Sequence, residues 1–127
     1  MRKLPDAHVA EDGPHGFKVH PPVAAVWRDE GFHFHNVTNQ LVTLQFPQGV
    51  LAADDRLASS AGLRELFPEA VAALLVYAVR WVGPDETIHL PFTTRPPRVV
   101  RYGVTVHTEK GPVDAPGGSA PKIIIEP

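Results

Sequence analysis

A strict alternation of apolar and polar side chains constrains this chain more than any other feature. In the stretch FHFHN at 32–36, Phe32 and Phe34 alternate with His33 and His35, and side chains two residues apart on a strand point to the same face. The pattern therefore predicts a half-buried strand with the phenylalanines in the core and the histidines facing solvent. Further alternating or β-prone segments recur at 17–20, 23–27, 41–46, 76–82, 86–92 and 98–107, the last being the longest. The closing KIIIE is apolar on both faces, which is typical of a strand at the centre of a sheet.

Prolines and glycines separate these segments, with 14 prolines and 10 glycines among the 127 residues. A chain of this length is the size of one domain. Short strands joined by tight turns predict an all-β fold, an antiparallel Greek-key sandwich of two sheets, with a closed barrel as the alternative. Within it, residues 32–35 and 42–46 are expected to pair as a hairpin across the polar turn NVTNQ.

Two regions depart from the strand pattern. Residues 1–16 carry charges, prolines and glycines with little to bury, so they are expected to form a flexible tail ahead of a domain over 17–127. Residues 52–75 place Leu57, Leu63, Leu66 and Phe67 at helical spacing, which predicts a short helical insertion. Residues 69–82 fit a helix by their alanines and a strand by the run VYAVRWV; we expect the helix to end near 75 and a strand to follow.

Composition excludes several classes of function. The chain has no cysteine, which rules out disulfides, thiolate metal sites and cysteine nucleophiles. A net charge of −2 argues against binding to nucleic acid or to an anionic membrane surface. The longest apolar run, at 70–79, is about half the length of a membrane span. These features predict a soluble, cytoplasmic protein.

Four stretches taken together resemble the cupredoxin pattern: FHFHNVTNQLVTLQFP, VGPDETIHLPF, YGVTVH and GGSAPKIIIEP. The resemblance implies the sandwich fold over residues 17–127 and places His35, followed by Asn36, at the first copper histidine and His107 at the second. The position of the copper cysteine falls on Val104, and the chain has no methionine besides Met1. A blue-copper centre requires a thiolate, so the resemblance implies the fold without the family's electron-transfer site.

Histidines alone offer a second kind of metal site. His33 and His35 lie about 6–7 Å apart on one strand face, and His89 or His107 on a neighbouring strand would complete a three-nitrogen site for copper(II) or zinc. Polar side chains are also what the outward face of a half-buried sheet ordinarily carries. We therefore expect no bound cofactor, and a histidine-based copper or zinc protein is the alternative.

The sequence favours a non-catalytic interaction or structural module over an enzyme, with a protein partner or self-association as its mode of action. Three surfaces are candidates: the loop at 108–120, the arginine-rich segment at 95–101, and the insertion with Leu63, Leu66 and Phe67. Loops held by a rigid scaffold are the usual place for such contacts.

Overall fold

The computed structural model describes residues 4–14, 16–52, 77–115 and 120–127. The described residues form strands and connecting segments without a helix. Their strands are β1 (Ala7–Asp12), β2 (Gly16–His20), β3 (Val23–Trp27), β4 (Phe32–Asn36), β5 (Leu41–Pro47), β6 (Tyr77–Val82), β7 (Thr87–Leu90), β8 (Val99–Arg101), β9 (Gly103–Thr108), β10 (Gly111–Asp114) and β11 (Lys122–Glu126). The all-β class is confirmed for this part of the chain, and the expected insertion at 52–75 falls outside it except for Ala52.

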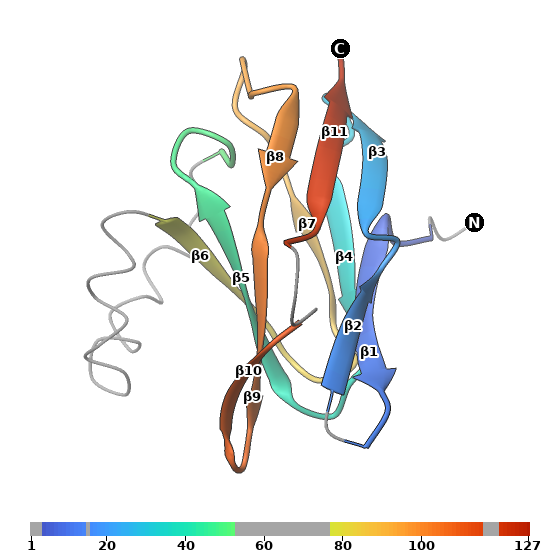
Figure 1. Ribbon diagram of the computed structural model, residues 1–127. Coiled ribbons are helices and arrows are strands. Elements are labelled where there is room, and N and C mark those ends of the chain that lie inside the picture. Colours follow the sequence, from blue (N-terminus) through green and yellow to red (C-terminus); the bar gives the residue numbers. More distant parts are fainter. Residues whose placement is uncertain (1–3, 15, 53–76, 116–119) are drawn as a thin grey trace.

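Two four-stranded sheets face each other across a shared core. One has the strand order β2-β1-β4-β7 and the other β10-β9-β5-β6 (Figure 1). Phe32 of β4 meets Phe46 of β5 edge to face, with ring centroids 6.2 Å apart, and Tyr102 stacks on Phe46 at 5.3 Å. Edge-to-face and offset-stacked ring pairs stabilise a core by more than the apolar area that they bury.

A third sheet, β3-β11-β8, lies at the top of Figure 1 and continues both layers. Strand β3 follows β2 after the proline pair 21–22, and β8 leads through Tyr102 into β9. Its inward side chains join the common core: Ala24, Val26, Val100, Ile123 and Ile125. The closing strand β11 lies at the centre of this sheet, as its two-sided apolar pattern predicts.

The alternation at 32–36 has the predicted meaning. Phe32 and Phe34 are fully buried, whereas His33 and His35 are partly exposed on the other side of the same strand. The expected hairpin between β4 and β5 is wrong, however, because the two strands belong to different sheets. The connection after Asn36 carries the chain from one layer to the other, so both apolar faces still reach one core.

Part of the tail expected over residues 1–16 is a strand in the structure. Residues 7–12 form β1, which pairs with β2 and, in parallel, with β4. Ala7 and Val9 point inward and are buried, which gives β1 the same alternation as the longer strands. Because only these two small apolar residues carry the pattern, the neighbouring charges concealed it.

Three further expectations need correction. The sheets are mixed, since β1–β4 and β3–β11 pair in parallel. The strand expected over 98–107 is divided at Tyr102 into β8 and β9. The loop expected over 108–120 contains β10, paired with β9 in a tight hairpin.

Among the described residues, no helix has the length and apolar character needed to cross a membrane.

Candidate functional site

Five of the seven histidines gather on the outer face of the β2-β1-β4-β7 sheet, which we call the histidine face. Each alternates along its strand with a buried residue and so points away from the core. The members of the histidine face are His8, His20, His33, His35 and His89. His107 lies on β9 in the other layer, and His15 is outside the described residues.

Strand register arranges one row of the histidine face across all four strands. His20 on β2 pairs with His8 on β1, His8 with His35 on β4, and His35 with Thr87 on β7. Partial burial lowers the pKa of His8, and the positive charges of His20 and His35 lower it further. The neighbouring imidazoles of this row therefore disfavour the charged form of His8.

The second row contains His33 and His89. These are cross-strand partners whose rings stack, with centroids 4.5 Å apart and planes inclined by 22°. The carboxylate of Asp6 accepts a hydrogen bond from the backbone N–H of His33 at 2.8 Å and lies 3.4 Å from its ring Nδ1. His89 Nε2 hydrogen-bonds with the carbonyl of Glu30 at 2.9 Å. His89 therefore lies beside His33 on the same face, which is the placement that a three-nitrogen site would require of it.

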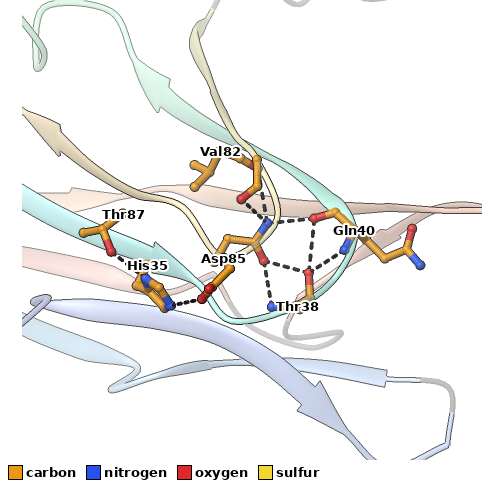
Figure 2. A network of polar contacts seen from close by, with 8 residues as sticks. His35, Thr38, Gln40, Val82, Asp85 and Thr87 are labelled. Atoms are coloured by element: carbon orange, nitrogen blue, oxygen red, sulfur yellow. Dashed lines mark hydrogen bonds and ion pairs between the residues drawn. The ribbon is translucent and has the colours of Figure 1, made fainter.

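His35 is held at both ring nitrogens (Figure 2). Nδ1 hydrogen-bonds with the hydroxyl of Thr87, and Nε2 lies 3.1 Å from the carboxylate of Asp85. Asp85 comes from the turn between β6 and β7 and is almost wholly exposed. These contacts orient the ring and leave neither nitrogen without a partner.

A buried amide next to His35 fixes the end of β4. Asn36 has no exposed surface, and its Nδ2 donates to the carbonyls of Gln40 at 2.7 Å, Gly83 at 3.0 Å and Val82 at 3.2 Å. Its Oδ1 accepts from the hydroxyl and the backbone N–H of Thr38, at 2.6 and 3.0 Å. Figure 2 shows this network joining the β4–β5 connection to the end of β6. Asn36 thereby fixes where the chain crosses from one layer to the other and where its neighbour His35 lies.

The structure separates the two histidines that the cupredoxin resemblance pairs. His35 points outward from one layer, whereas His107 alternates with the buried Val106 and points outward from the other. His107 Nε2 hydrogen-bonds with the hydroxyl of Thr43 at 3.0 Å, and its ring stacks on Trp81. Burial lowers the pKa of His107. With no cysteine in the chain and these imidazoles on opposite layers, the residues do not fit a blue-copper centre.

In the part of the chain that the structure describes, no three histidine, aspartate or glutamate side chains are arranged to hold a metal ion together. The carboxylates of Asp6 and Asp85 nevertheless contact His33 and His35. Sequence spacing did not reveal them, because they reach the sheet face from the segment before β1 and from a turn.

A second surface is the outer face of the β3-β11-β8 sheet, which we call the Trp27 face. Register aligns Ala25, Ile124 and Val99 in one row across the three strands. Trp27, which is 59% exposed, lies opposite Glu126 at the end of β3. Of the five large hydrophobic side chains exposed in the described residues, three belong to this sheet: Val23, Trp27 and Val99.

Basic side chains surround the Trp27 face. Lys122 of β11 pairs in register with Arg101 of β8 at one end. Near the other end, the Arg98 guanidinium lies 3.7 Å from the Glu126 carboxylate, where both groups are solvent-accessible. A pocket of about 360 Å³ adjoins it, lined by Arg28, Arg95, Pro96, Arg98, Ile125 and Pro127. The arginine-rich segment at 95–101 therefore borders an exposed apolar surface. No sequence pattern indicated that surface.

Comparison of this chain with family models, with curated proteins and with solved structures gives no match.

Proposed function

We propose that this chain is a non-catalytic protein-binding domain and that the Trp27 face is its binding surface. The observation that carries the proposal is the clustering of exposed large hydrophobics on one small sheet: Val23, Trp27 and Val99. Scattered apolar side chains are normal on a protein surface, but a contiguous patch with a polar rim is typical of an interaction site. Tryptophan and arginine, both present here, are among the residues most enriched where a few side chains dominate binding energy.

The charge around the patch defines the partner. Five basic side chains border it: Arg28, Arg95, Arg98, Arg101 and Lys122. They face three acidic ones: Asp29, Glu30 and Glu126. This local excess of positive charge contrasts with the net charge of −2 for the whole chain. Complementary charge steers association and suppresses wrong partners. The partner is therefore a polypeptide segment with apolar side chains flanked by aspartate or glutamate.

Self-association through the same surface is the less favoured arrangement. Two copies meeting face to face would bring like-charged rims together, which costs free energy. Sedimentation of the chain over a range of concentrations distinguishes the two arrangements. A dimer that dissociates when Trp27 is replaced by alanine would contradict the proposal of an acidic partner.

The cupredoxin-like Greek-key architecture is part of this proposal. Strand order along the chain and the buried Asn36 next to an ordered histidine support it. Without the copper ligands, such a scaffold would serve as a rigid support for a binding surface.

Selection from a random-peptide display library tests the proposal, because it samples many candidate partner sequences at once. We expect selected peptides to combine acidic with aromatic or aliphatic residues and to bind more weakly as the salt concentration rises. Replacing Trp27 with alanine should lower the affinity for these peptides about thirtyfold or more, since removing a dominant tryptophan costs about 2 kcal/mol or more of binding free energy. Val37→Ala is the matched control, because Val37 is similarly exposed but lies outside this sheet. Peptides without acidic residues, or equal binding to the Trp27→Ala variant, would contradict the proposal.

A further inference from the structure

The rings of His8 and His20 face each other across two antiparallel strands of the histidine face. They are direct register partners, their centroids lie 5.9 Å apart, and their planes are inclined by 53°. His8 is partly buried, and His20 on the edge strand β2 is exposed. The pair is therefore anchored on one side and open to solvent on the other.

This separation lies within the range spanned by two imidazoles bound to one metal ion. A metal–nitrogen distance of about 2.0–2.1 Å, with the ring centroid about 1.1 Å behind the nitrogen, places each centroid roughly 3.1 Å from the ion. Two such rings then lie roughly 4.4 Å apart for a 90° angle at the metal, roughly 5.1 Å for a tetrahedral angle and roughly 6.2 Å for a linear one. The observed 5.9 Å falls between the tetrahedral and the linear separations.

The other histidines of this face are less suited to the same role. The rings of His33 and His89 are stacked and nearly parallel, so their lone pairs do not converge on one point. His35 already uses both nitrogens, on Thr87 and Asp85. By contrast, within the described residues no hydrogen bond engages the ring nitrogens of His8 or His20.

We propose that His8 and His20 chelate a divalent transition-metal ion, with water completing its coordination. Neutral imidazole is a good ligand for zinc and copper(II), and copper(II) is bound more tightly than zinc by a given nitrogen site. Two nitrogen donors leave positions open, so the bound ion remains accessible to water and to a third ligand. The site is separate from the Trp27 face, and its failure would leave the protein-binding proposal intact.

Titration of the full chain with copper(II) or zinc chloride, followed by calorimetry, tests the site. We expect one strong site per chain, tighter for copper(II) than for zinc. Replacing either histidine, as His8→Gln or His20→Gln, should weaken binding by at least about tenfold, since even changes around metal-bound histidines cause losses of that size. The matched controls His33→Gln and His89→Gln each change the other cross-strand pair of this face, which the proposed site does not use, and should leave the affinity unchanged.

Two readouts keep the test decisive. Electron paramagnetic resonance of the copper(II) complex should show coupling to nitrogen in the wild type and reduced coupling in His20→Gln. Melting of each variant without metal shows whether it is folded, and His20→Gln, on an exposed edge strand, is the variant least able to disturb the fold. Absence of binding, undiminished binding by His8→Gln and His20→Gln, or equal losses in the control pair would each overturn the proposal.

Discussion

Replacing Asn36 by alanine tests the account of how the two layers are joined. The side chain has no exposed surface and makes contacts with three carbonyls and with the hydroxyl and N–H of Thr38. Because its two N–H groups serve three acceptors, the change removes the equivalent of about four hydrogen bonds, each worth about 1 kcal/mol net. It also leaves buried carbonyls without a donor. We expect the free energy of unfolding to fall by about 4 kcal/mol, a large part of the roughly 5–15 kcal/mol typical of a domain.

Urea unfolding followed by tryptophan fluorescence measures this loss, and the melting temperature should fall by about 12–20 °C. The matched control is Thr93→Val, which removes one solvent-accessible hydrogen bond, from Oγ1 to the Gly49 carbonyl at 2.9 Å. Its cost should stay below about 1 kcal/mol. A loss under about 1.5 kcal/mol for Asn36→Ala would refute the reasoning, because the buried amide would then contribute no more than an ordinary surface bond.

Other predictions concern buried and titrating groups. The phenol oxygen of Tyr102 is buried and has no hydrogen-bond partner within the described residues, and burial raises the pKa of this phenol. Tyr102→Phe should therefore raise the free energy of unfolding, measured by urea titration, by about 1 kcal/mol. A decrease in the free energy of unfolding would show that the hydroxyl has a hydrogen-bond partner. The pKa values of His8 and His107 are lowered in the folded state, so the unfolded chain takes up protons first as the pH falls through about 6.5. The melting temperature should consequently be lower at pH 5.5 than at pH 7.5, and less so in His8→Gln; a melting temperature that rises on acidification would contradict this assignment.

Where the sequence predicts a strand, it also predicts the direction in which the side chains point, because a period of two determines facing. Phe32 and His33 lie as expected for this reason. The same period does not say which strands are neighbours. The pairing of β4 with β1 and β7, rather than with β5, depends on the Asn36 network and on core packing between distant segments.

For the candidate sites too, the sequence predicts which way a side chain faces but not which strands are neighbours. His33, His35 and His89 were recognised from alternation and do share a face. His8 and His20 were missed, because each lies in a short segment interrupted by charges or prolines, and only register brings them together. The Trp27 face was hidden for a similar reason, since its apolar row is assembled from three strands that are far apart along the chain.

Mapping of backbone amide shifts by nuclear magnetic resonance, with a selected acidic peptide added to the full chain, tests the proposed binding surface most directly. The account predicts shifts concentrated on β3, β8 and β11 and around the pocket formed by Arg28, Arg95 and Arg98. Shifts confined to the β2-β1-β4-β7 sheet, or spread evenly over the molecule, would contradict it.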